Sequence, residues 1–259
     1  MRPPLPVSLT LPPISVYSPK KGNHFPQWGG AHLIMAVTTI VVTGICIVAA
    51  RSLSPATLAR QLIGWLLLSL SISWFVYTNL PGKYDPAESL PLHLTDWLRV
   101  ISPLALITNS RKLTAISFYW GLLLNLQAII TPSLTYIHPT YLQFVEYWLT
   151  HIALFVIPAV LTWGFGYRPS WKDWRFIVVF SHGWAGMTGI FNKLTGGNYG
   201  YLAGKSGEKS ALDFFGPWPW YIGTLSVLCC SIWAGMTAPF ARTTAPKEGL
   251  GTHVKGGCV

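Results

Sequence analysis

The chain has 259 residues, of which 51% are hydrophobic and only 10% are charged, and it contains 13 tryptophans. This composition is far from that of a soluble globular domain and predicts a multi-pass membrane protein. The formal net charge of +10 comes from basic residues scattered over short loops. We therefore expect contact with membrane lipids and exclude nucleic acid as a partner.

Three regions follow from the distribution of apolar residues. Residues 1–30 are rich in proline and lack the short apolar core of a secretory signal, so we expect a retained, irregular extension. Residues 31–240 form one membrane domain. Residues 241–259 are rich in Gly, Thr and Lys, and we expect a flexible tail.

Seven segments of the membrane domain are long enough to span a bilayer, because a hydrocarbon core of about 30 Å needs about 20 helical residues. The expected fold is therefore all-α, a bundle of seven transmembrane helices. The first segment is the most lipid-like, whereas polar side chains in the third, fifth and sixth indicate the inner walls of the bundle. The segments are 32–50, 62–80, 89–109, 112–131, 141–163, 174–194 and 217–238.

Basic residues are more frequent in the loops after the first, third and fifth segments than in the opposite loops. Since such loops stay in the cytoplasm, we expect the N-terminus outside the cell membrane and the C-terminus in the cytoplasm. The residues behind this expectation are Arg51, Arg60, Arg111, Lys112, Arg168, Lys172 and Arg175.

The third segment has four polar side chains on one helical arc, His93, Thr95, Asp96 and Arg99. Ionisable groups are costly inside a membrane and indicate function unless they satisfy one another. Thr95 is a candidate nucleophile, although a lone threonine more often bonds to the carbonyl oxygen one turn earlier. Arg99 could hold a lipid's polar end or stabilise an oxyanion.

The fifth segment has a second polar arc, which contains Glu146 and His151. A histidine on a neighbouring helix is better placed than His93 to serve as the base for Thr95. The alternative is that these groups only stabilise the packing of the bundle, with Asp96 paired to Arg99 and Glu146 paired to a histidine or a hydroxyl.

Other segments contribute weaker candidates. In the fourth, Asn125 and Gln127 are more often interhelical hydrogen-bond donors than ligand contacts. His182 in the sixth is either a cavity residue or a packed, hydrogen-bonded histidine. We expect structural thiols, no metal site and no cofactor, because no paired cysteines or metal-binding motif occurs.

Several segments together resemble the YwaF family of bacterial membrane proteins, which is similar to the eukaryotic transmembrane protein 164 group. The pieces occur in family order and include the distinctive GPWPWY and NYxYL motifs. They are Leu90–Asp96, Tyr119–Leu122, Leu126–Pro132, Phe144–His151, Arg168–Lys172, Asn198–Leu202 and Gly216–Tyr221.

The resemblance implies a seven-span bundle and, in eukaryotic relatives, lipid acyltransferases with a membrane-embedded Cys and His. The position that matches Thr95 is commonly Cys, whereas the position that matches His151 is His. A hydroxyl is far less ionised than a thiol and depends more on its base, so this departure puts acyl transfer in doubt but leaves a Thr/His mechanism open.

The sequence therefore favours a lipid-modifying enzyme that works by acyl transfer or ester hydrolysis. Thr95 would be the nucleophile and His151 the general base, with Arg99 or Asn198 on the lipid's polar end. The alternative is a non-catalytic transporter or a scaffold that binds other membrane proteins. The residues expected to bind or orient the substrate are His93, Asp96, Arg99, Gln127, Glu146, His182, Asn198 and Tyr199.

Overall fold

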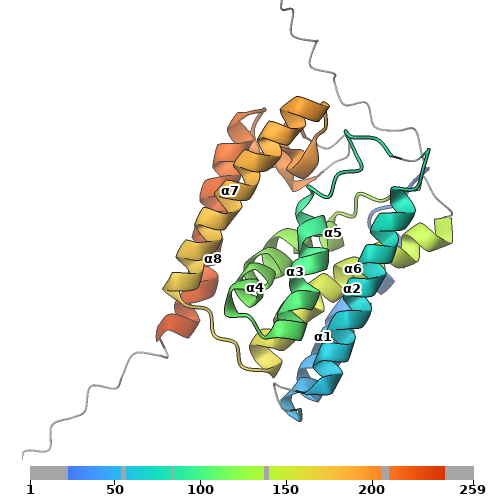
Figure 1. Ribbon diagram of the computed structural model, residues 1–259. Coiled ribbons are helices and arrows are strands. Elements are labelled where there is room, and N and C mark those ends of the chain that lie inside the picture. The colour runs from blue at the N-terminus through green and yellow to red at the C-terminus, as the bar shows by residue number, and fades with distance from the viewer. Residues whose placement is uncertain (1–22, 54–56, 83, 137–139, 206–209, 243–259) are drawn as a thin grey trace, which may run out of the picture.

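A computed structural model describes residues 23–53, 57–82, 84–136, 140–205 and 210–242 (Figure 1). It confirms the all-α fold, with seven helical segments in the described residues. They are α1 (Gly30–Arg51), α2 (Leu58–Thr78), α3 (Leu94–Thr108), the run of α4 (Arg111–Ile116), η1 (Ser117–Leu124) and α5 (Asn125–Ile130), the run of α6 (Thr140–Ala159) and η2 (Val160–Gly164), α7 (Trp171–Thr195) and α8 (Trp220–Arg242). Short elements are β1 (Asn23–His24), paired antiparallel with β2 (Thr135–Tyr136), and the turns η3 (Tyr199–Tyr201) and η4 (Ala211–Phe215).

Five of these segments are long and apolar enough to cross a membrane, namely α1, α2, Arg111–Ile130, Thr140–Gly164 and Trp220–Ala241. The chain is therefore a multi-pass membrane protein, but α3 and α7 are not among the five. Helix α3 has only 15 residues, about 22 Å at the usual rise. The predicted tail and most of the predicted N-terminal extension lie outside the described residues.

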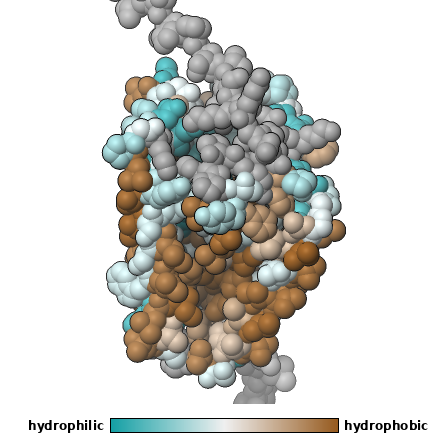
Figure 2. Space-filling view, turned by 90° about the vertical axis from the view of Figure 1, so that its right-hand side faces the viewer, coloured by the Kyte–Doolittle hydropathy of each residue, from teal (hydrophilic) through white to brown (hydrophobic). Residues whose placement is uncertain are grey.

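The outer surface matches a lipid environment. Apolar side chains of α1 and α2 are largely exposed, with Ile40 at 72% and Leu58 at 67%. Figure 2 shows one face on which hydrophobic residues cover most of the lower part and hydrophilic residues gather at the upper end. Exposed apolar side chains need hydrocarbon around them, so this belt marks the depth of the bilayer.

The most buried segment is the fourth, α4–η1–α5, which was not among the three segments expected to form the inner walls. Phe118, Tyr119 and Trp120 on η1 are almost completely buried. The Trp120 ring stacks edge-on against Trp184 of α7, with ring centroids 5.4 Å apart, and its Nε1 donates to Ser181 Oγ at 2.8 Å. Aromatic residues pack equally well against protein or lipid, so hydropathy could not identify this segment as central.

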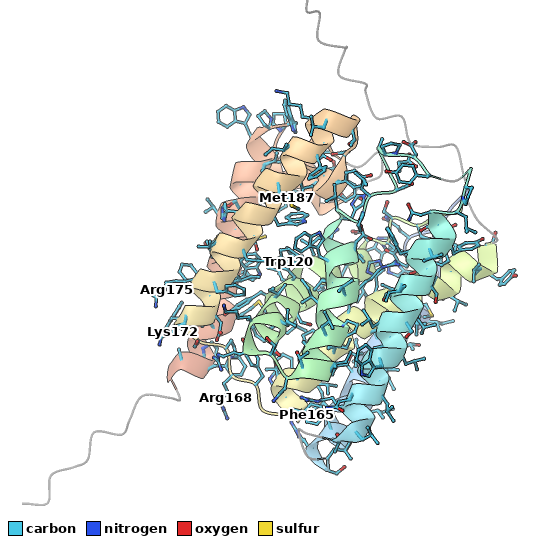
Figure 3. The ribbon with its side chains drawn as sticks, in the orientation of Figure 1. Trp120, Phe165, Arg168, Lys172, Arg175 and Met187 are labelled. Carbon is cyan, nitrogen blue, oxygen red and sulfur yellow. The ribbon has the colours of Figure 1, made fainter. Side chains whose placement is uncertain are left out.

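Most of the described basic residues lie in the loops and helix ends toward the lower end of Figure 1, and Figure 3 labels Arg168 in the loop before α7 and Lys172 and Arg175 on the first turns of α7. Arg111 donates to Asp173 from Nε at 3.1 Å and from Nη2 at 2.5 Å, and this joins α4 to α7. We call this region the basic end. The loops at the opposite end meet over the start of α3.

Candidate functional site

The polar face of α3 begins at Thr95 instead of His93, because His93 precedes the helix with an extended backbone. Its N–H donates to Asp96 Oδ2 at 3.0 Å, which is the hydrogen bond of a helix cap. Proline at position 91 and this cap stop the helix from starting at residue 89. His93 therefore lies above the helix instead of on its polar arc.

The His93 ring packs against Tyr199, with ring centroids 5.2 Å apart. The Tyr199 hydroxyl donates to the Pro86 carbonyl oxygen at 2.8 Å and accepts from the Leu90 N–H at 2.9 Å. Burial raises the pKa of Tyr199 to about 12, so the phenol stays neutral and can both donate and accept. Tyr199 thus holds the loop before α3 in place.

Asn198 belongs to the loop after α7, which meets the loop before α3 through Tyr199. Its amide accepts a hydrogen bond from the Ala203 N–H and donates to the Gly204 carbonyl oxygen, both at 2.9 Å. These bonds fold residues 198–204 over the start of α3. The side-chain hydrogen bonds of Asn198 and Tyr199 therefore go to backbone atoms of the protein.

The centre of the α3–α6 contact is an ion pair. Arg99 Nη2 lies 2.7 Å from Glu146 Oε1, and both side chains are only 16% exposed. Thr150, one turn after Glu146, donates to the same carboxylate oxygen at 2.9 Å. Arg99 therefore pairs with Glu146 on the neighbouring helix, whereas Asp96, its expected partner, caps α3.

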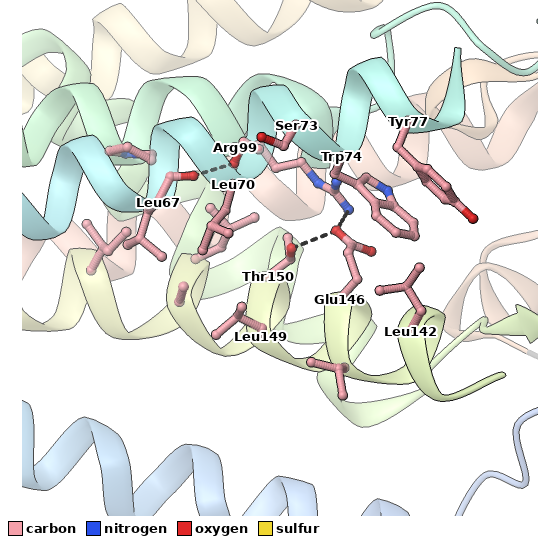
Figure 4. A pocket seen from close by; sticks show the side chains of 16 residues that line it. Leu67, Leu70, Ser73, Trp74, Tyr77, Arg99, Leu142, Glu146, Leu149 and Thr150 are labelled. Carbon is pink, nitrogen blue, oxygen red and sulfur yellow. Dashed lines mark hydrogen bonds and ion pairs between the residues drawn. The ribbon is translucent and has the colours of Figure 1, made fainter. Parts of the chain in front are cut away.

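This ion pair lies in a pocket of about 380 Å³ between α2, α3 and α6, lined by 16 residues. Figure 4 shows Trp74 and Tyr77 of α2 beside Arg99, with leucines of α2 and α6 along the rest of the wall. The α2 residues were not expected, because an apolar, mostly exposed helix carries no sequence signal for a binding site. Pockets of this size and apolar character are typical of small-molecule and lipid sites.

His151 lies on α6 and is buried. Its Nδ1 lies 2.7 Å from Asn125 Oδ1, and Asn125 Nδ2 donates to the His151 carbonyl oxygen at 2.9 Å. The Tyr147 ring covers the imidazole, with centroids 4.3 Å apart. Asn125 is thus an interhelical hydrogen-bond partner, as expected, but its pairing with this histidine was not predicted.

Thr95 is partly buried on α3, one turn before Arg99 and on the same face. Within the described ranges no hydrogen bond joins Thr95 to His151. Neither residue is among those that line the pocket. The two predicted catalytic residues therefore lie beside the pocket rather than inside it.

Two other candidates lie elsewhere. Gln127 donates to Thr131 one turn later in its own segment, not to another helix. The His182 ring lies between α7 and α8, with Nε2 2.8 Å from Ser226 Oγ and Nδ1 2.7 Å from the Val178 carbonyl oxygen. The His182 ring is exposed, makes these two contacts, and does not line the pocket. No group of three or more His, Cys, Asp or Glu side chains that could hold a metal occurs in the described ranges.

Comparison with known proteins agrees with the fold and with the resemblance of the motifs. No curated protein and no solved structure matches the chain. Residues 27–237 match the TMEM164 family, and this range includes every helical segment before α8, most of α8 and the pocket. The chain is therefore a membrane protein that belongs to the TMEM164 family.

Proposed function

We propose that this chain is an integral membrane enzyme that processes lipid acyl groups, by acyl transfer or ester hydrolysis. Thr95 is the nucleophile and His151 the general base and then acid. The observation that supports this best is the 2.7 Å contact between His151 Nδ1 and Asn125 Oδ1. A hydroxyl nucleophile needs a base, and the base needs a third group that orients it.

The two bonds of Asn125 define the protonation of the histidine. Asn125 Nδ2 donates to the His151 carbonyl oxygen, so its Oδ1 is the atom that faces the ring. An amide oxygen can only accept a hydrogen bond, so Nδ1 carries the proton. Nε2 then has the free lone pair, which is the form required of a general base.

In the proposed reaction, His151 Nε2 accepts the Thr95 proton while the Thr95 oxygen bonds to the acyl carbonyl carbon. The ester bond of the donor lipid breaks, and its departing oxygen takes the proton from His151. Water or the hydroxyl of an acceptor lipid then gives its proton to His151 and takes the acyl group. Thr95 regains its proton, so His151 acts once as base and once as acid in each half-reaction.

The remaining candidates have supporting roles in this proposal. Arg99 holds the lipid's polar end, and Glu146 orients Arg99. Asp96 and His93 fix the start of the helix that carries Thr95. Tyr199 and Asn198 shape the loop that covers His93, and Gln127 and His182 have no part in the reaction.

A second candidate is a non-catalytic transporter or a scaffold component. One observation favours it: the Arg99–Glu146 ion pair lies in the pocket, whereas Thr95 and His151 do not line it. A transporter would use the ion pair in a solute or proton path. Its activity would then survive the loss of the Thr95 hydroxyl.

The test is acyl turnover by the purified protein in liposomes that contain lipids with labelled acyl chains. We expect Thr95→Ala and His151→Ala to lose turnover by at least about a hundredfold, the usual contribution of a general base. Thr38→Ala is the matched control, because its hydroxyl only bonds to the Ile34 carbonyl oxygen of its own lipid-facing helix. Full turnover in either site variant would remove the enzyme proposal in favour of the transporter.

We further propose that the protein lies in the cell membrane with its N-terminus outside and the basic end in the cytoplasm. Exposed Arg51, Arg168, Lys172 and Arg175 belong to loops or helix ends at the basic end. Lys and Arg in short loops favour the cytoplasmic side.

A further inference from the structure

The pocket between α2, α3 and α6 opens at the side of the molecule rather than at either end. Three of its lining residues are about half exposed: Leu70 at 45%, Leu149 at 48% and Val145 at 56%. They belong to helices long and apolar enough to span the membrane. A ligand would therefore enter from the hydrocarbon of one leaflet, without crossing water.

The polarity of the pocket changes along its length. Trp74 and Tyr77 lie in the last turns of α2, beside the ion pair (Figure 4). Leu67 and Ile157 line it deeper in the bundle. Trp and Tyr favour the head-group level of a bilayer, so the polar end lies where lipid esters lie and the apolar end where acyl chains lie.

The charges at the polar end cancel. Arg99 Nη2 and Glu146 Oε1 are paired at 2.7 Å. Arg99 Nε is buried and has no hydrogen-bond partner. An atom with so little accessible surface does not meet a ligand directly, but the Arg99 side chain lines the pocket, so a ligand oxygen can accept from the part of the guanidinium that faces it.

An anionic head group fits this site poorly. A phosphate near Arg99 would also lie close to Glu146, and like charges repel strongly in a low dielectric. An ester or hydroxyl oxygen can accept from the Arg99 guanidinium without displacing Glu146. The neutral Arg99–Glu146 pair therefore favours a lipid with an uncharged head group over one with an anionic head group.

We infer that this pocket binds one acyl chain of an uncharged glycerolipid, taken directly from the bilayer, with an ester or hydroxyl oxygen on Arg99. The inference rests on the proposed function for its choice of a lipid. Its test measures binding alone, so it can fail independently of catalysis.

The probe is a monoacylglycerol with a photoreactive diazirine in its acyl chain, used with the purified full chain in phosphatidylcholine nanodiscs. We expect adducts on residues 67–77 and 142–157. Leu70→Trp and Ala153→Phe fill the pocket from α2 and α6, and each should lower labelling by at least about tenfold, equivalent to 1.4 kcal/mol. Ile72→Trp is the matched control, because Ile72 is 54% exposed on α2 and does not line the pocket.

The head group is tested with lysophosphatidic acid that carries the same chain and diazirine. The wild type should label more strongly with the monoacylglycerol. Glu146→Gln leaves the Arg99 charge unpaired, so labelling by lysophosphatidic acid should rise about tenfold relative to the neutral probe.

Three results would overturn the inference: adducts only outside α2 and α6, equal labelling of the wild type and both filled variants, or stronger labelling of the wild type by the phosphate probe. Labelling that persists in Thr95→Ala while turnover is lost supports the pocket and the reaction together. Labelling as inferred with full turnover in Thr95→Ala supports the pocket and removes only the reaction.

Discussion

At the scale of single residues, the two ring nitrogens of His151 have different environments, because Asn125 contacts only Nδ1. We predict that Asn125→Leu, which keeps the size of the side chain but not its polar atoms, lowers kcat strongly and changes KM little. It should also destabilise the fold by about 1–3 kcal/mol, because buried groups on His151 lose their partner. Steady-state acyl turnover and thermal unfolding of the same preparation measure both effects.

Asn125→Asp is the informative companion. It keeps an oxygen that can accept from Nδ1 and loses only the donor to the His151 carbonyl oxygen. We expect it to retain more turnover than Asn125→Leu. The reverse order would show that Asn125 does not orient the base.

Thr95 allows a prediction of increased activity. A thiol ionises far more readily than a hydroxyl and depends less on its base. Thr95→Cys should therefore raise acyl turnover above that of the wild type. In the His151→Ala background, Thr95→Cys should raise acyl turnover more than Thr95→Ser does. Loss of turnover in Thr95→Cys with the fold intact would argue against Thr95 as the nucleophile.

Residue types indicated that Arg99, Glu146 and His151 face inward, because charged or hydrogen-bonding groups avoid lipid. Their partners could not be predicted. Glu146 pairs with Arg99 only because α6 crosses α3 at that level. Such crossings depend on helix packing, which a single sequence does not specify.

At the scale of helices, the Asn125–His151 pair depends on how closely η1 approaches α6. A Cβ at Gly121 would lie 2.6 Å from the Leu154 carbonyl oxygen. Gly121 precedes Asn125 by one turn, and Leu154 follows His151 by nearly one turn, so the two contacts are adjacent layers of one interface. The π-helical turn of η1 ends directly before Asn125 and sets its direction.

We predict that Gly121→Ala lowers the unfolding temperature and the acyl turnover together, because the backbones must separate; overpacking costs about 1–3 kcal/mol. Gly44→Ala is the control, since nothing lies within 4 Å of the added Cβ there. Differential scanning fluorimetry in detergent compares the two. Equal stability of both variants would contradict the close approach.

Helix positions were largely predictable from apolar length, as for α1, α2 and α8. The start of α3 was missed although Pro91 and the His93–Asp96 cap are local signals for it, and the segment before it is also held by Tyr199, more than a hundred residues away in the sequence. Sequence periodicity contains no information on such a tertiary hydrogen bond. The same holds for the pocket, which needs α2 and α6 side by side.

At the scale of the whole molecule, the basic end and the opposite loops differ in charge, and this difference predicts the orientation. In a chain with Cys258→Ser, we expect Ser133→Cys to react with a membrane-impermeant maleimide on intact cells. Ser52→Cys, at the basic end, should react only after permeabilisation. Both positions are exposed, so the opposite pattern would mean an inverted protein.

Helices α7 and α8 are joined to each other through Trp174, which donates to the Cys230 carbonyl oxygen at 3.0 Å. They meet the other segments chiefly through aromatic side chains, above all Trp120, which points from the fourth segment toward α7 (Figure 3). Loss of the Trp120 indole would therefore act on the α7–α8 hairpin as a whole and not on one helix alone. It would weaken one contact of a hairpin that the Arg111–Asp173 ion pair and the hydrogen bonds of Tyr119 with Thr237 and Trp233 still hold to the fourth segment, so the seam between them is secured at several separate points.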